Sequence, residues 1–117
     1  MNNEKFPFFS NNIRRFWQQN EWWFSIEDLL LNFIEISKLE EFLHKIIFRD
    51  EEFQNQYGKI CHTLEANTGF VTEKLICTNL EGIFRIIQLI ESPKAEPFKL
   101  WLAKLGKERI NELANPN

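Results

Sequence analysis

The sequence predicts an α+β domain in which two β-hairpins, expected to form one small antiparallel sheet, pack with four to five α-helices. Three observations lead to this prediction. The chain has 117 residues, the length of one domain, and its 44% apolar content is sufficient for a core. Two stretches rich in β-formers are each interrupted by a turn-like segment. Between and after these stretches, apolar residues recur at helical spacing.

The first hairpin is expected over residues 13–24. The segment IRRFW (13–17) and Trp22–Phe24 are strand-like because of their aromatic content. The polar segment between them is turn-like, and its Asn20 can adopt the left-handed conformation. Residues 1–12, rich in Asn and Phe, are expected to form a loose N-terminal arm.

Two helices are expected next. Residues 25–28 (SIED) match a capping pattern, because the Ser25 hydroxyl can accept from the backbone N–H three residues on. The second helix is expected from about Lys38 to Phe48, since its apolar residues lie on one face. These residues are Leu39, Phe42, Leu43, Ile46 and Ile47.

The second hairpin is expected to pair Lys59–Glu65 with Val71–Thr78, with Gly69 supplying a positive φ in the loop. The segment Thr78–Glu81 reads as another capping box. The helix that it opens is expected to bury five apolar residues. They are Leu80, Ile83, Phe84, Ile87 and Ile90.

The last helical region begins at Ser92–Pro93, an N-cap followed by proline at the first helical position. Pro97 predicts an irregular or kinked first turn. Gly106 is expected to end this helix, and a short helix is expected over Lys107–Leu113. The expected buried stripe consists of Phe98, Trp101, Leu102 and Leu105.

Charge is distributed unevenly along the chain. The net charge of −3 counts against a strong non-specific polyanion binder. Between Gln18 and Glu52 three basic residues stand against nine acidic ones, whereas Pro93–Arg109 has five basic and two acidic. A mildly acidic protein can therefore still carry a locally basic face, the alternative being ordinary solvated helix surface.

The residues suited to metal binding or catalysis are few. Cys61, His62, Cys77 and His44 are the soft or borderline ligands, and they show no C-x-x-C or H-x-x-x-H spacing. Neither histidine has a recognisable nucleophile context, and four glycines cannot build a phosphate loop. We therefore expect two buried thiols, no metal and no enzymatic activity. Two cysteines and the lack of a long apolar run indicate a cytoplasmic protein without a membrane segment.

Two kinds of candidate binding residue remain. Positive side chains could contact DNA phosphates, although the acidic residues beside them on the second helix would repel phosphate. The candidates are Arg14, expected to point outward from its strand, and Lys38, Lys45, Arg49, Lys94, Lys99 and Lys104. Trp22 and Trp23 face opposite sides of a strand, so one of them could form a partner surface unless a helix covers it.

Two segments together resemble a known family, the Bro-N domain. One runs from IRRFW (13–17) through EWWFSIEDL (21–29), and the other from TNLEGIFRIIQ (78–88) through SPKAEPFKLWL (92–102). The resemblance covers the chain from Ile13 to Asn111. Bro-N domains occur in phage antirepressors, related viral proteins and bacterial proteins like DNA-damage-inducible protein D. The chain departs from the pattern at Asn20, where the family usually has glycine, and in its acidic segment 35–57.

The resemblance implies a regulatory domain of a phage or prophage protein over residues 13–113, without cofactor or catalysis. Residues 114–117 would be a tail, either of a stand-alone domain or before a separate C-terminal domain. Two functions follow as hypotheses. The domain binds duplex DNA through a basic surface, or it binds a repressor or another protein without contacting DNA. A homodimer would suit a palindromic site.

Overall fold

The computed structural model describes residues 12–67 and 69–114. The expected N-terminal arm and C-terminal tail therefore lie, apart from Asn12 and Ala114, outside the described residues. Four antiparallel strands form one sheet in the order β1-β2-β4-β3. The strands are β1 (Arg15–Gln18), β2 (Glu21–Ser25), β3 (Cys61–Asn67) and β4 (Thr72–Thr78). The predicted single sheet built from two hairpins is confirmed.

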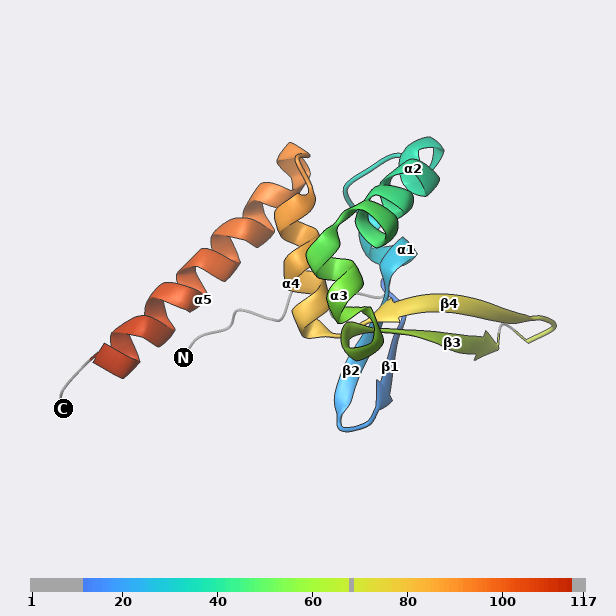
Figure 1. Ribbon diagram of the computed structural model, residues 1–117, viewed down its shortest axis with the longest axis horizontal. Helices are drawn as coiled ribbons and strands as arrows, with labels where there is room; N and C mark the ends of the chain where they lie inside the picture. The colour runs from blue at the N-terminus through green and yellow to red at the C-terminus, as the bar shows by residue number, and fades with distance from the viewer. Residues whose placement is uncertain (1–11, 68, 115–117) are drawn as a thin grey trace.

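The two hairpins meet over a very short junction. Only Phe24 with Thr78 and Ser25 with Cys77 pair between β2 and β4. From this junction the hairpins diverge, as Figure 1 shows for the β1–β2 pair and the long β3–β4 pair. The tight turn of the first hairpin has positive φ at both Gln19 and Asn20. That geometry matches the twist of antiparallel strands, so Asn20 serves where glycine would be the commoner choice.

Two helices before the second hairpin were predicted, and the structure contains three. Helix α1 (Ile26–Leu30) is capped by Ser25, whose hydroxyl accepts from the Asp28 backbone N–H, as predicted. The turn η1 (Ile36–Lys38), helix α2 (Leu39–His44) and the π-turn η2 (Lys45–Arg49) make up the second helix. Its apolar face, with Ile46 and Ile47 buried, is confirmed.

Helix α3 (Glu51–Ile60) was not predicted. Asp50 caps it by accepting from the Phe53 N–H at 2.7 Å, and its apolar stripe is short, with Phe53 and Ile60 buried and Tyr57 half-buried between them. The predicted strand from Lys59 therefore begins only at Cys61, because residues 59 and 60 end this helix. Contacts with the rest of the core stabilise α3 despite its polar sequence.

Helix α4 (Leu80–Leu89) begins one residue later than predicted. Its N-cap is Asn79, whose side chain accepts from the Gly82 N–H, whereas the Thr78 hydroxyl donates to the Ile60 carbonyl at 2.7 Å. Leu80 is exposed instead of buried, and Ile86 lies in the core. The remaining apolar face of α4 packs as expected.

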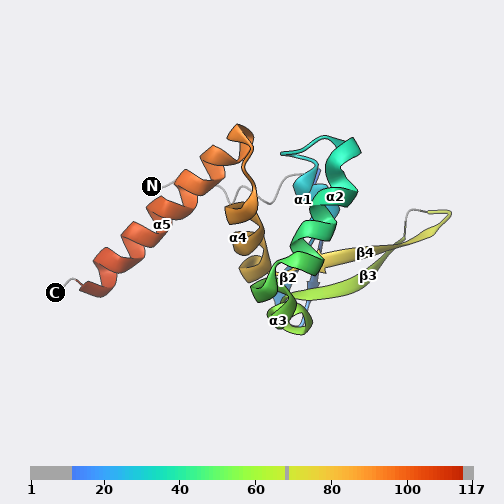
Figure 2. The ribbon, with the colours of Figure 1, turned by 45° about the horizontal axis from the view of Figure 1, so that its top comes forward.

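The final helix differs most from the prediction. After the short turn η3 (Pro93–Ala95), α5 runs without a break from Glu96 to Ala114. The predicted irregular first turn is confirmed, since Pro93–Ala95 form a 3-10 turn. The prediction that Gly106 ends the helix is wrong, because α5 continues through it to Ala114. The expected stripe is only half-buried, and Leu105 is exposed. Figures 1 and 2 both show α5 leaving the body of the domain beyond α4.

The sheet has apolar residues on both faces. The main core lies between the helices and one face, with Phe24, Phe53 and Ile83 fully buried. A smaller cluster on the other face includes Trp23, Leu75 and Cys77. Of the helices within the described residues, none combines the length and apolar character that crossing a bilayer requires.

Candidate nucleic-acid interface

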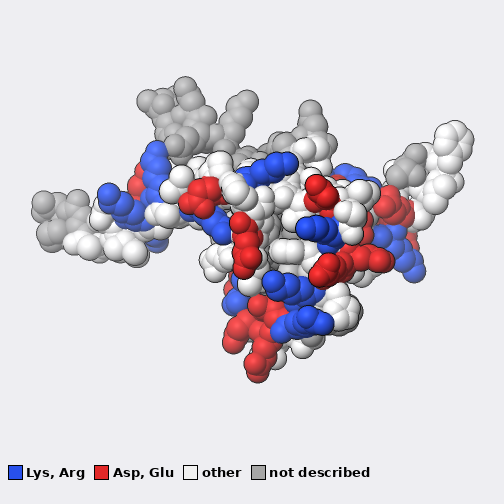
Figure 3. Space-filling model, turned by 90° about the horizontal axis from the view of Figure 1, so that it is seen from above, with Lys and Arg blue, Asp and Glu red and all other residues white. Residues whose placement is uncertain are grey.

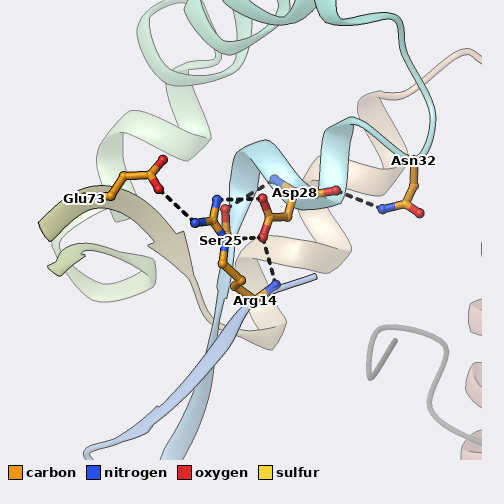
Figure 4. Close-up of polar contacts among 5 residues, drawn as sticks. All are labelled: Arg14, Ser25, Asp28, Asn32 and Glu73. Atoms are coloured by element: carbon orange, nitrogen blue, oxygen red, sulfur yellow. Dashed lines mark hydrogen bonds and ion pairs between the residues drawn. The ribbon is translucent and has the colours of Figure 1, made fainter. Parts of the chain in front are cut away.

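Arg14 does not extend freely from its strand as the sequence suggested. Its Nε and Nη2 donate to the two carboxylate oxygens of Asp28 at 2.8 and 3.0 Å, and its Nη1 donates to Glu73 at 3.0 Å (Figure 4). Burial raises the pKa of Asp28, but the hydrogen bonds and charge of Arg14 outweigh burial and hold that pKa below its ordinary value. Two carboxylates therefore compensate the Arg14 charge, and the residue joins elements of the fold.

Three other predicted cations gather around helix α4. A hollow of about 330 Å³ is lined by Lys45, Arg49 and Gln88, together with the acidic residues Asp50 and Glu91. A neighbouring hollow of about 380 Å³ is lined by Gln88, Lys99, Leu102 and Ala103. Because Gln88 belongs to both hollows, the tertiary structure brings cations from η2 and α5 to the two sides of one exposed amide. We call these residues, Lys45, Arg49, Gln88 and Lys99, the α4 groove.

Lys99 also makes a hydrogen bond that connects two helices of the domain. Its Nζ donates to the carbonyl of Ile90 at 2.6 Å, and Ile90 is the C-cap of α4. An ammonium at the negative end of a helix is electrostatically favourable. The contact ties α5 to α4, while the ammonium keeps further donors for an anion.

Arg85 is a cation that the sequence analysis did not single out. It is half-buried on α4 three residues before Gln88, so the two lie on the same side of the helix. Its Nε is buried and has no hydrogen-bond partner among the described residues. Its position on the face of α4 opposite the apolar stripe could have identified Arg85 as a candidate from the sequence.

The remaining predicted cations lie outside the groove. Lys38 is exposed on η1, Lys94 is exposed on η3, and Lys104 is exposed on α5. Seen from above, Lys and Arg residues are interspersed with Asp and Glu (Figure 3). That face therefore has mixed charge instead of a continuous positive field.

The two adjacent tryptophans have different environments. Trp23 is only 1% exposed, its indole N–H donates to the Gln18 carbonyl, and its ring meets His62 edge-on. It is a core residue, covered by the smaller apolar cluster of the sheet, and therefore does not form a partner surface. Trp22 is half-buried and lies edge-to-face against Trp17, which is 56% exposed. We call Trp17, Trp22 and Arg15, whose guanidinium lies over Trp22, the hairpin aromatic surface.

The candidate metal ligands do not converge. Cys61 pairs with Thr78 and His62 with Cys77, so the two free thiols lie on opposite faces of the sheet. Burial raises the pKa of Cys61 to about 12 and that of Cys77 to about 11. Within the described residues, no group of three or more His, Cys, Asp or Glu side chains could hold a metal ion.

Comparison with known proteins identifies one family. The model of the BRO family N-terminal domain, Bro-N, matches residues 12–110. Neither the curated proteins nor the solved structures contain a match to the chain. Bro-N domains are regulatory and non-enzymatic, and the family points to an antirepressor-like role in phage. Because the match covers most of its length, the chain belongs to the BRO family through its N-terminal domain.

Proposed function

We propose that this domain is the DNA-binding regulatory module of a phage or prophage antirepressor-like protein, and that it contacts duplex DNA through the α4 groove. The observation that carries this proposal is that Lys45 and Arg49 line one hollow and Lys99 lines another, with the exposed Gln88 lining both. Positive groups in two adjacent hollows suit the successive phosphates of a DNA backbone. Arg85 adds a fourth cation on the same side of α4.

The chemistry of the groove favours backbone docking with limited base reading. Lysine and arginine contacts to phosphate supply affinity without sequence information, whereas a glutamine amide can pair with the edge of adenine. Asp50 and Glu91 line the same hollow as Lys45 and Arg49 and repel phosphate. We therefore expect weak binding that is strongly reduced by salt.

The proposal is tested by fluorescence anisotropy with a mixed-sequence duplex at two salt concentrations. The double variant Lys45→Gln, Arg49→Gln should bind more weakly and should lower the salt slope by about 2, since each phosphate contact contributes roughly 0.9. The control Lys74→Gln removes a cation from β4, on the long hairpin directed away from α4 in Figure 1, and should change neither quantity. Absence of salt-sensitive binding at low ionic strength would refute the proposal, as would an unchanged double variant.

A second candidate function is binding of a repressor protein through the hairpin aromatic surface. The exposed Trp17 and half-buried Trp22 favour it, because tryptophan supplies much of the energy of protein interfaces. In a pull-down with the purified repressor and no DNA, Trp17→Ala should reduce recovery at least tenfold. Phe70→Ala, which removes a fully exposed aromatic ring elsewhere, should leave recovery unchanged.

A further inference from the structure

A hollow of about 900 Å³, larger than the two beside α4, lies between α2, η2, α3 and β4. Each of these four elements contributes an apolar or aromatic side chain to its lining, namely Leu43, Ile47, Tyr57 and Ile76. Ile47 is buried and the other three are half-buried, so these residues form an apolar floor. We call this hollow the α2–α3 groove.

The rim of the α2–α3 groove is polar and open to solvent. Glu40, Glu41, His44 and Gln54 also line the groove, and all four are exposed. Small-molecule sites usually bury most of the surface of their ligand, whereas an open apolar groove receives the apolar face of an amphipathic helix. The groove therefore has the shape of a docking site for a helix.

The rim also carries negative charge that no cation of the described residues neutralises. Glu40 and Glu41 are adjacent in the first turn of α2. Among the described residues, neither forms an ion pair with a lysine or an arginine, and no lysine or arginine lines the groove. Lys45, one turn after Glu41, lines the hollow beside α4 instead. Because opposite charges across an interface select the partner, the two carboxylates favour an occupant that carries lysine or arginine.

The exposed apolar end of α5 does not match this charge. Ile110 and Leu113 are exposed there, but residues 107–113 contain two basic and two acidic residues, and Arg109 is paired with Glu112. A segment without net positive charge is not selected by the carboxylates of the rim. The occupant that matches the groove in shape and in charge is a separate, basic helix.

We propose that the α2–α3 groove binds a basic amphipathic helix of a partner protein. Apolar side chains spaced i, i+4 and i+7 on that helix pack against Leu43, Tyr57 and Ile76, while its flanking lysine or arginine side chains approach Glu40 and Glu41. The α2–α3 groove shares no lining residue with the hollow that contains Lys45 and Arg49. The partner helix and DNA therefore use different surfaces of the domain.

Fluorescence anisotropy of the full chain with a labelled peptide tests this proposal. The probe is a synthetic helix of about 15 residues with leucine on one face and lysine on the other. A second peptide with glutamate in place of every lysine is the control for apolar binding alone. The unaltered chain should bind the lysine peptide and should bind the glutamate peptide at least about tenfold more weakly, because the rim repels glutamate.

Two matched double variants locate the binding site. Glu40→Gln, Glu41→Gln should weaken binding of the lysine peptide by about tenfold, since it removes both charges of the rim. Glu51→Gln, Glu52→Gln changes the net charge equally and also alters two adjacent, exposed glutamates in the first turn of a helix, but neither residue lines the groove. It should leave the affinity nearly unchanged. Circular dichroism verifies that both variants are folded.

The apolar floor is tested separately by NMR. On addition of the lysine peptide, the backbone amide signals of Leu43, Tyr57 and Ile76 should shift more than those of α5. Largest shifts outside the α2–α3 groove would overturn the proposal, as would equal weakening by the two double variants, since net charge would then explain the binding. Lack of binding to the lysine peptide at millimolar concentration would overturn it as well. No DNA is present, so the result is independent of the proposed function.

Discussion

Arg14 and Asp28 are joined by three hydrogen bonds. The guanidinium donates twice to the carboxylate, and the Arg14 backbone N–H also donates to Asp28 Oδ2 at 2.8 Å. Asp28 belongs to α1 and Glu73, the second partner of Arg14, to β4. One side chain before β1 therefore ties the first hairpin to a helix and to the second hairpin.

Asp28→Ala should destabilise the domain by about 2–3 kcal/mol, because hydrogen bonds to charged groups are among the stronger ones and Arg14 would lose its main partner. Urea unfolding measures this loss. The control Glu112→Ala removes the exposed i,i+3 pair with Arg109 and should cost less than about 0.5 kcal/mol. Equal effects of the two substitutions would contradict a structural role for Asp28.

The stabilising effect of Asp28 should depend on pH. Because its pKa is lower in the folded state than in the unfolded chain, its contribution is fully present above the unfolded pKa and is lost as pH falls through the folded pKa. The difference in unfolding free energy between wild type and Asp28→Asn should therefore shrink below about pH 4. A difference that stays constant between neutral and strongly acidic pH would rule this linkage out.

Gly82→Ala should destabilise the domain by about 1–3 kcal/mol, the usual cost of overpacking a core. An added Cβ would collide with the Thr78 side chain, whose hydroxyl donates to the Ile60 carbonyl. Gly58→Ala is the control, because it adds a methyl group in open space within α3 and should stabilise by about 0.5–1 kcal/mol. Thermal unfolding measures the stability of both variants. A Gly82→Ala variant as stable as the wild type would contradict the predicted collision with the Thr78 side chain.

Lys99→Met should lower stability by about 1 kcal/mol, because it removes the hydrogen bond to the end of α4. Lys94→Met, on the exposed turn η3, should have little effect on stability. Urea unfolding compares the two. If Lys99→Met were as stable as Lys94→Met, the hydrogen bond to Ile90 would not contribute to the free energy of unfolding.

Cys61 and Cys77 should resist alkylation in the folded protein at pH 8. Both thiols are buried and their raised pKa values leave little thiolate, which is the reactive species. Iodoacetamide followed by mass spectrometry should add no label under native conditions and two labels in urea. Rapid native labelling would show that the sheet opens at these positions.

Local features were predictable because neighbouring residues determine them. The turn at Asn20, the Ser25 cap and the irregular start of the last helical region depend on a few contiguous residues, and the structure has all three. The apolar face of α2 and η2 follows from helical spacing in the same way. The family resemblance also came from the sequence, and the match over residues 12–110 confirms it.

Features that depend on contacts between residues far apart in the sequence were determined by the tertiary structure. Gly106 stays helical although glycine often ends a helix. Helix α3, by contrast, has Asp50 as its cap and Phe53, Tyr57 and Ile60 at positions i, i+4 and i+7, so its sequence could have indicated it. Arg14 was expected on the surface because its sequence neighbours do not include Asp28 or Glu73. The grouping of Lys45, Arg49 and Lys99 around Gln88 likewise joins three helical segments. Sequence spacing determined most of the helices and strands and the Ser25 cap, whereas long-range packing determined which charges are compensated and which residues meet.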